Sequence, residues 1–172
     1  ASLFIVKRID GVYGVIVALT PVEGSAWVQI PLDTPSSMKL YFIRHGLTPY
    51  NKLGLTNGQR IDEPLAEEGK TQALELSEVI PKDIQHIDSS DLLRAKQTAE
   101  IINQKLGVNL TFHQELREID LGNFTGKSWQ EINELAGRDL KESYLAHNYD
   151  LKPWGGESVV EVDTRLNKFL EQ

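Results

Sequence analysis

A cation, an imidazole and a glycine follow one another in "LYFIRHGLTPYN", residues 40–51, where an apolar run ends. The guanidinium of Arg44 is a permanent positive charge with a planar fork of donors that suits a phosphate. A neutral imidazole on His45 has a lone pair that can attack phosphorus and form a phosphohistidine. Gly46 lets the backbone approach an anion, and N–H groups at a helix start would favour that anion. The pattern indicates phosphoryl chemistry; an ordinary loop with a solvated arginine is the alternative.

Four further segments follow in order: "DEPLAEEGKTQA", "SSDLLRAKQTAEII", "LREIDLGNFTG" and "PWGGES". Together with "RHGLTPYN" they resemble the motifs of the histidine phosphatase superfamily, also called the phosphoglycerate mutase-like family. The resemblance covers residues 39 to about 170, and this ordered set is far more specific than any single motif. It implies an α/β fold and an enzyme that forms a phosphohistidine.

The resemblance implies a role in the reaction for four residues. His45 matches the nucleophile that is phosphorylated during turnover. Arg44 and Arg94 match the two arginines that hold the phosphoryl oxygens and offset developing negative charge. Glu118 matches the general acid that protonates the leaving oxygen. Glu115 is the alternative carboxylate, but the spacing to the glycine of "DLG" favours Glu118. A surface arginine on a helix is the alternative interpretation of Arg94.

Further residues match family positions that bind the substrate. Gly46, Thr48 and Asn51 match positions beside the phosphate, and Asn51 is favoured over Thr48. Gln59 is expected at the rim of the site, although an alignment of the family position with a residue next to Gln59 fits equally well. The two arginines are expected to bind the substrate too.

The family also has a second catalytic histidine, in an "HG" pair after a strand, beyond the helix with which the printed sequence stops. His86, His113 and His147 lie in other contexts and are interpreted as structural or exposed. Thr125 stands where a glutamate is common in the family. The catalytic core is therefore expected to be incomplete at its C-terminal end, with the missing strand absent or supplied by a complementing chain.

Strands and helices alternate from residue 38 onward, which predicts an α/β domain with a mostly parallel sheet flanked by helices. Ligands of such sheets bind at the carboxyl ends of the strands, where "RHG" is expected. The expected strands cover residues 38–44, 84–91 and 108–114. The expected helices cover residues 66–81, 92–107, 128–147 with a break near Gly137, and 156–172. In the first of these, Leu74, Val79 and Ile80 are expected on the apolar side.

Residues 1–37 differ from the rest of the chain because they are rich in strand-forming residues. The runs 3–9 and 12–19, separated by an Asp-Gly pair, predict a β-hairpin. This segment is expected to be an added N-terminal region, or a terminal hairpin of the family moved to the front. Residues 38–172 are expected to form the histidine phosphatase domain.

The composition argues against several other classes of function. The chain has 172 residues, a net charge of −7 and no cysteine. An acidic chain without a basic face is a poor nucleic-acid binder, and no apolar run is long enough for a membrane span. No metal or cofactor is expected, and a small phosphorylated metabolite is the expected partner in the cytoplasm. A homodimer is an open possibility, because a free sheet edge favours pairing.

Within the family, a short segment between Gly126 and Pro153 and the "GGES" motif favour the phosphatase branch. Cofactor-dependent phosphoglycerate mutases usually have a long insertion here, and a short segment leaves less cover to keep water from the phosphoenzyme. The expected function is therefore a phosphomonoesterase, of the histidine acid phosphatase type, that acts on a small phosphorylated metabolite. Mutase-type phosphotransfer and a catalytically incomplete phosphate-binding domain are the alternatives.

Overall fold

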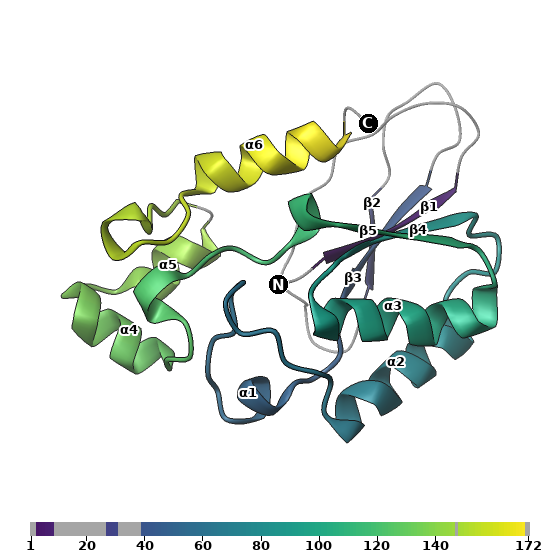
Figure 1. Cartoon of the computed structure of the whole chain (residues 1–172), viewed down its shortest axis with the longest axis horizontal. Helices are drawn as coiled ribbons and strands as arrows, with labels where there is room; N and C mark the ends of the chain where they lie inside the picture. The colour runs from purple at the N-terminus through teal and green to yellow at the C-terminus, as the bar shows by residue number, and fades with distance from the viewer. Residues whose placement is uncertain (1–2, 9–26, 31–38, 147, 171–172) are drawn as a thin grey trace.

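The computed structural model describes residues 3–8, 27–30, 39–146 and 148–170. Its centre is a five-stranded sheet in the order β2-β3-β1-β4-β5 (Figure 1). The strands are β1 (Leu3–Arg8), β2 (Trp27–Ile30), β3 (Lys39–Arg44), β4 (His86–Ser90) and β5 (Asn109–His113). The α-helices are α1 (Pro49–Lys52), α2 (Glu67–Val79), α3 (Leu93–Leu106), α4 (Trp129–Ala136), α5 (Leu140–Leu145) and α6 (Val159–Leu170). Short 3-10 turns are η1 (Gln114–Leu116), η2 (Gly122–Phe124) and η3 (Lys152–Trp154).

The sheet contains two sets of strands that run in opposite directions. β3 and β4 both pair antiparallel with β1, and β5 pairs parallel with β4, so β3, β4 and β5 run the same way. β2 is antiparallel to β3 at the outer edge. The strands of the expected phosphatase domain therefore have their carboxyl ends at one edge of the sheet. β1 fills a central position between two of them.

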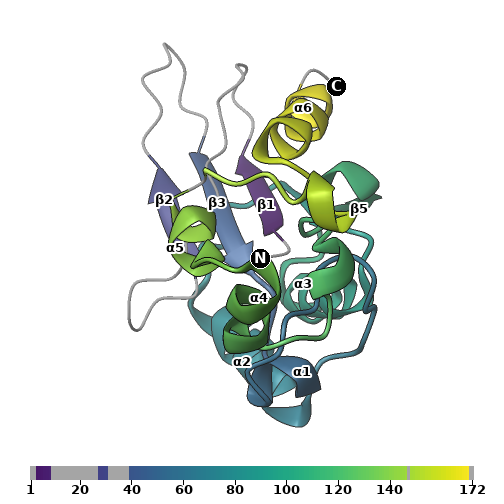
Figure 2. The same cartoon turned by 90° about the vertical axis from the view of Figure 1, so that its left-hand side faces the viewer.

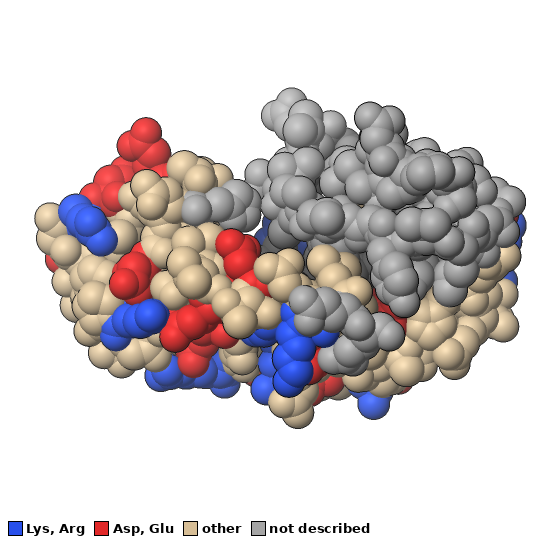
Figure 3. Space-filling model, turned by 90° about the horizontal axis from the view of Figure 1, so that it is seen from above, with Lys and Arg blue, Asp and Glu red and all other residues tan. Residues whose placement is uncertain are grey.

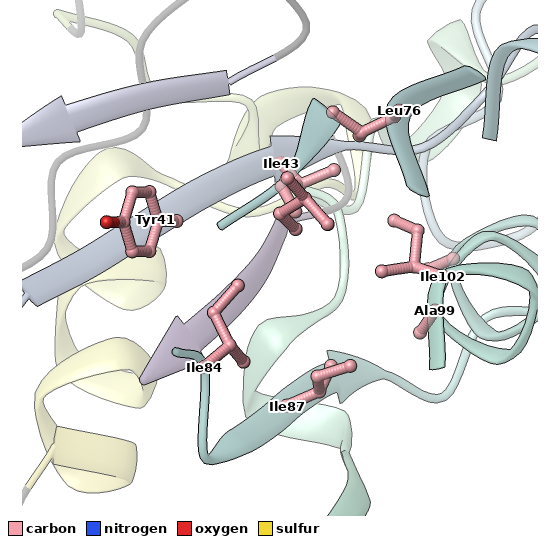
Figure 4. Close-up of a cluster of buried hydrophobic side chains, with 9 residues drawn as sticks. Tyr41, Ile43, Leu76, Ile84, Ile87, Ala99 and Ile102 are labelled. Atoms are coloured by element: carbon pink, nitrogen blue, oxygen red, sulfur yellow. The ribbon is translucent and has the colours of Figure 1, made fainter. Parts of the chain in front are cut away.

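Helices α2 and α3 cover one face of the sheet, and α6 lies on the other side (Figures 1 and 2). A cluster of buried apolar side chains joins the strands to α2 and α3 (Figure 4). Ile43 and Ile87 come from the strands, Leu76 from α2, and Ala99 and Ile102 from α3. Removal of this apolar surface from water is the main term that stabilises the layer.

The buried side of α2 differs from the expected one. Leu74 and Val79 are 53% and 68% exposed, whereas Ala73 and Ser77 are buried. Ile80 is buried as expected, just after the helix ends. Ala73, Leu76 and Ser77 lie on the buried face of α2, and α2 makes extensive contact with α3. Packing against α3, rather than the most apolar stripe, sets the buried face.

A second apolar cluster lies among the shorter helices and turns. Phe124, Ile132 and Leu140 are its most deeply buried members, each no more than 2% exposed. The predicted break near Gly137 is confirmed, because α4 ends there with a φ of 66° that favours glycine. This cluster supports the segment that contains Glu118.

The expected fold class, an α/β domain with a sheet flanked by helices, is confirmed; β3, β4 and β5 run in the same direction as expected, and β1 and β2 run antiparallel to them. Residues 12–19 of the expected hairpin lie outside the described residues, and β1 pairs on its two sides with β3 and β4. Within the described part of the chain, no helix is long and apolar enough to span a membrane. On the face seen in Figure 3, acidic and basic side chains are interspersed among the described residues.

Candidate active site

His45 lies directly after β3, at the carboxyl end of the strand, and is only 7% exposed. Its Nδ1 lies 2.7 Å from the carbonyl oxygen of Gly46. A carbonyl can only accept, so Nδ1 carries the proton and the ring lone pair is on Nε2. Burial is the main cause that lowers the pKa of His45 from 6.5 to about 3, and the charges of Arg94 and Arg44 act in the same direction. The imidazole is therefore neutral near pH 7.

The turn after His45 is locked against the start of α2 by two glycines. The backbone N–H of Gly46 donates to Oγ1 of Thr98 at 3.1 Å, and that of Leu47 donates to Oε1 of Gln72 at 2.9 Å. A Cβ on Gly46 would lie closer than 3.0 Å to the carbonyl of Gly69, and a Cβ on Gly69 would lie as close to the carbonyl of Leu47. Backbone therefore packs on backbone, which fixes the position of the imidazole.

Thr48 and Asn51 form the cap of the single-turn helix α1. Oγ1 of Thr48 accepts from the backbone N–H of Asn51 at 3.2 Å and from Nδ2 of Asn57 at 3.0 Å. Oδ1 of Asn51 accepts from the backbone N–H of Thr48 at 3.3 Å. These bonds form a capping box, so both side chains shape the turn beside His45. Their contact with substrate stays a prediction.

Arg94, in the first turn of α3, is fully buried. Its Nη1 donates to the carbonyl of Ile61 at 2.9 Å and its Nη2 to the carbonyl of Gly58 at 2.7 Å. Its Nε is buried without a hydrogen-bond partner among the described residues. Burial lowers the pKa of Arg94 and the charge of Glu118 opposes this, but a guanidinium starts so high that it stays charged. A buried cation that influences His45 suits a phosphoryl oxygen.

Glu118 follows η1, and its carboxylate interacts electrostatically with Arg94 and His45. The hydroxyl of Tyr144 on α5 donates to its Oε1 at 3.3 Å. Burial acts to raise the pKa of Glu118, whereas the positive charge of Arg94 acts to lower it. Glu118 is also among the charges that act on the pKa of His45. The structure thus brings Glu118 to the site, whereas Glu115 contributes a backbone carbonyl to Arg165 of α6.

Gln59, expected at the rim of the site, is engaged within the protein. Its Nε2 donates to Oε2 of Glu157 at 3.0 Å, so the residue links the turn before α2 to the "GGES" motif. Thr125 has a buried Oγ1 without a hydrogen-bond partner among the described residues. Substrate contact by Gln59 stays a prediction.

Tyr144 is the residue at this site that sequence reasoning missed. It stacks on Tyr149, with ring centroids 5.2 Å apart, and packs against Trp129 at the same distance. Burial and the charge of Glu118 raise the pKa of Tyr144 well above its usual value, so its hydroxyl remains a donor. The sequence did contain aromatic residues in and just after the expected helical segment 128–147. It did not indicate that one of them contacts Glu118.

The other histidines are occupied elsewhere. His86 on β4 and His113 on β5 each place Nε2 2.9 Å from Oδ1 of Asp88, and Thr111 donates to the same oxygen at 3.0 Å. This cluster lies below α6, where Phe169 meets the ring of His113 edge-on. His147 lies outside the described residues. No group of three or more acidic or histidine side chains in the described chain has the arrangement of a metal site.

In a comparison with protein families, residues 40–172 match the histidine phosphatase superfamily (branch 1). A curated relative from Salmonella paratyphi A, named "Probable phosphoglycerate mutase GpmB", is 35% identical over 134 residues. The match covers 77% of this chain and 61% of that relative. The protein of the same name from Salmonella choleraesuis has the same identity and coverage. The chain thus spans 61% of the length of these relatives.

Solved structures give the same fold with different printed names. TTHB049 from Thermus thermophilus has a TM-score of 0.61 and 38% identity over 74% of this chain and 68% of that one. A phosphoglycerate mutase from the same organism has a TM-score of 0.60 and 36% identity over the same shares. A protein titled "Mycobacterial hydrolase 1" has a TM-score of 0.61 and 34% identity over 74% of this chain and 61% of that one.

Proposed function

The chain belongs to the histidine phosphatase superfamily, branch 1, and from this membership and its site we propose that it transfers phosphoryl groups through a phosphohistidine at His45. One observation carries the proposal. The imidazole is buried and neutral, its Nδ1–H is held by the carbonyl of Gly46, and its lone pair is on Nε2. This is the form of histidine that acts as a nucleophile at neutral pH.

The residues around His45 support both steps of such a transfer. Nε2 attacks the phosphorus of a phosphomonoester, so that an N–P bond forms and the P–O bond to the leaving alcohol breaks. The leaving oxygen takes a proton from Glu118, while Arg44 and Arg94 offset the charge on the phosphoryl oxygens. An acceptor, either a hydroxyl or water, then takes the phosphoryl group from Nε2 and returns a proton to Glu118.

The proton on Glu118 depends on the substrate. Burial acts to raise its pKa, while the positive charge of Arg94 acts to lower the pKa and favours the carboxylate in the free protein. A bound phosphomonoester brings negative charge that offsets this cation, so the pKa of the carboxyl rises when the substrate binds. We therefore expect the protein to take up a proton from the buffer as it binds a phosphomonoester.

The printed names of the relatives favour mutase-type transfer over the phosphomonoesterase expected from the sequence. The two reactions differ in the acceptor, which is a hydroxyl of a phosphorylated small molecule in one and water in the other. We therefore propose phosphotransfer of the phosphoglycerate mutase type first. Hydrolysis is the second candidate, supported by the relative titled as a hydrolase and by the short segment that contains α4 and α5.

The test is capture of the phosphoenzyme, which does not require complete turnover. The chain is incubated with radiolabelled 2,3-bisphosphoglycerate and quenched in base, because phosphohistidine survives base. We expect label on the wild type, none on His45→Ala, and retained label on His86→Gln, a matched histidine change on β4. Absence of base-stable label on the wild type, or full label on His45→Ala, would contradict the proposal.

The fate of the label separates the two candidate reactions. Transfer of the phosphoryl group to added 3-phosphoglycerate is expected for the mutase type. Release as inorganic phosphate at the same rate with and without 3-phosphoglycerate would favour hydrolysis. Both products are separated by ion-exchange chromatography of a single reaction mixture.

A further inference from the structure

Arg165 on α6 holds the backbone of the segment that contains Glu118. Its Nη1 donates to the carbonyl of Glu115 at 2.6 Å, and its Nη2 donates to the carbonyl of Glu118 at 3.2 Å. Its Nε and Nη2 also bind the carboxylate of Glu157, at 3.0 and 3.2 Å. One guanidinium therefore connects the proposed general acid to α6 and to the motif before that helix.

Every described partner of the Glu157 carboxylate is a donor. Besides Arg165, the carboxylate accepts from the backbone N–H of Asp120 at 2.8 Å and from Nε2 of Gln59 at 3.0 Å. The backbone N–H of Glu157 also donates to the carbonyl of Asp120 at 2.8 Å. A carboxylate, which accepts at both oxygens, suits this position, and an amide side chain would turn its own donors toward these donors.

The two segments joined by these bonds also fit each other in shape. A Cβ on Gly122 would lie closer than 3.0 Å to the carbonyl of Trp154, and a Cβ on Gly156 would lie as close to the carbonyl of Asp120. Arg60 ties the same contact together, because it binds the carboxylate of Asp120 at 2.8 and 3.1 Å and the carbonyl of Gly155 at 2.6 Å. The segment that contains Glu118 is thus held against residues 154–157, and the ion pair of Glu157 with Arg165 lies at the centre of this contact.

We propose that Arg165 and Glu157 are positioning residues that set the location of the Glu118 carboxyl, and so control protonation of the leaving group. This inference rests on the proposed function, in which Glu118 is the general acid. Arg165 binds the backbone carbonyl of Glu118 directly. Without the guanidinium, the backbone of Glu118 can shift, and its side-chain carboxyl shifts with it. A displacement near 1 Å in a catalytic group can cost about 100-fold in rate.

The test compares two phosphoryl donors that differ in their need for an acid. The alcohol oxygen that leaves from 2,3-bisphosphoglycerate must be protonated as it leaves, whereas 4-nitrophenolate leaves from 4-nitrophenyl phosphate without a proton. In Arg165→Met, phosphorylation of His45 should slow roughly 10- to 100-fold with 2,3-bisphosphoglycerate and remain near the wild-type rate with 4-nitrophenyl phosphate. A variant that merely weakened the fold would slow with both donors.

Three further variants sharpen the comparison. Arg165→Lys keeps the charge but loses the fork, so it should lose part of the rate, and it serves if Arg165→Met fails to fold. Glu157→Gln should show the same dependence on the leaving group as Arg165→Met. Lys168→Met removes a cation from an exposed position of the same helix and should match the wild type with both donors.

A double variant tests whether Arg165 acts through the acid. In a Glu118→Gln background, Arg165→Met should cause no further loss with 2,3-bisphosphoglycerate, because the acid is already gone. Equal losses with both donors, or additive losses in the double variant, would overturn the positioning role. Failure of the proposed function itself looks different, because the wild type would then acquire no label from either donor.

Discussion

The two halves of the candidate site are held in place in different ways. The nucleophile half consists of His45, residues 46–51, the first turn of α2 and Arg94, and it is fixed by burial and by backbone packed on backbone. The acid half consists of residues 115–124, residues 154–158 and α6. Its backbone is also closely packed at Gly122 and Gly156, but charged hydrogen bonds join its segments as well.

Exposure makes the contrast concrete. In the nucleophile half, the side chains of Thr48 and Arg94 are each 0% exposed. In the acid half, the side chains of Glu157 and Arg165 are 21% and 17% exposed, so water reaches the pair. The imidazole therefore cannot be moved without disturbance of the core, whereas the acid rests on bonds that single substitutions can change while the fold remains.

The strongest test of the nucleophile half uses its response to acid. The folded pKa of His45 is about 3, below its ordinary value of 6.5, so the unfolded chain binds a proton that the folded chain refuses. Stability contributed by the neutral imidazole is therefore complete above pH 6.5 and is lost as the pH falls toward 3. His45→Asn has no such proton to bind, and its stability should fall less in this window, by on the order of 4 kcal/mol at the acidic end.

Urea unfolding at a series of pH values measures this difference directly. The comparison at about pH 7.5, where both side chains are neutral, gives the effect of the substitution apart from the proton. Parallel stability curves for wild type and variant across the acidic range would show that burial does not suppress protonation of His45, and the contrast between the halves would break.

Gly69→Ala tests whether shape fixes the nucleophile half. Alanine is favoured over glycine inside a helix by about 1 kcal/mol, so a neutral site would gain stability. A Cβ here meets the rigid carbonyl of Leu47, which has no flexible end that could move. We expect a net loss of about 2 kcal/mol, measured by urea unfolding, and slower phosphorylation of His45. Lys70→Ala, an exposed neighbour paired with Glu67, should change stability by less than about 0.5 kcal/mol.

A Gly69→Ala variant as stable as the wild type would mean that the turn and α2 can separate. The nucleophile half would then be as adjustable as the acid half. Loss of phosphorylation without loss of stability would have a narrower meaning, namely that the turn moves while the core keeps its packing.

Local patterns in the sequence predicted the nucleophile half better than the acid half. An apolar strand that ends in "RHG" placed His45 at the carboxyl edge of the sheet, and glycines ended α3 and α4 where expected. The buried face of α2 was wrong because Leu74 and Val79 were judged by hydropathy, while packing against α3 buries another face of the helix. The position of β1 between β3 and β4 depends on pairing between distant residues, which no local pattern contains.

The bonds of the acid half also join distant segments. Tyr144 and Arg165 reach Glu118 from two helices far along the chain, and periodicity in either helix indicates neither bond. The motif "GGES" was recognised in the sequence, but the residue types alone did not show that Glu157 accepts hydrogen bonds from Asp120 and Arg165. Charged hydrogen bonds between segments are harder to infer than a strand end, because each needs both partners in place.

Tyr144→Phe is the mildest test of the acid half. It removes the hydroxyl that donates to Glu118 and keeps the ring that packs against Tyr149 and Trp129. Loss of one hydrogen bond to a carboxylate should cost about 1 kcal/mol in stability. Loss of a donor to the charged form also raises the pKa of Glu118. The fall in the rate of His45 phosphorylation by 2,3-bisphosphoglycerate on the alkaline side should therefore move to higher pH.

Tyr149→Phe is the matched control, because it removes the other hydroxyl of the stacked pair. We expect its alkaline limb to stay closer to that of the wild type than the limb of Tyr144→Phe. Equal shifts in the two variants would show that the polarity of the whole aromatic cluster, rather than one bond, sets the proton affinity of Glu118. The acid half would then depend on its apolar surroundings as the nucleophile half does, and the ionic pair beneath it would set position alone.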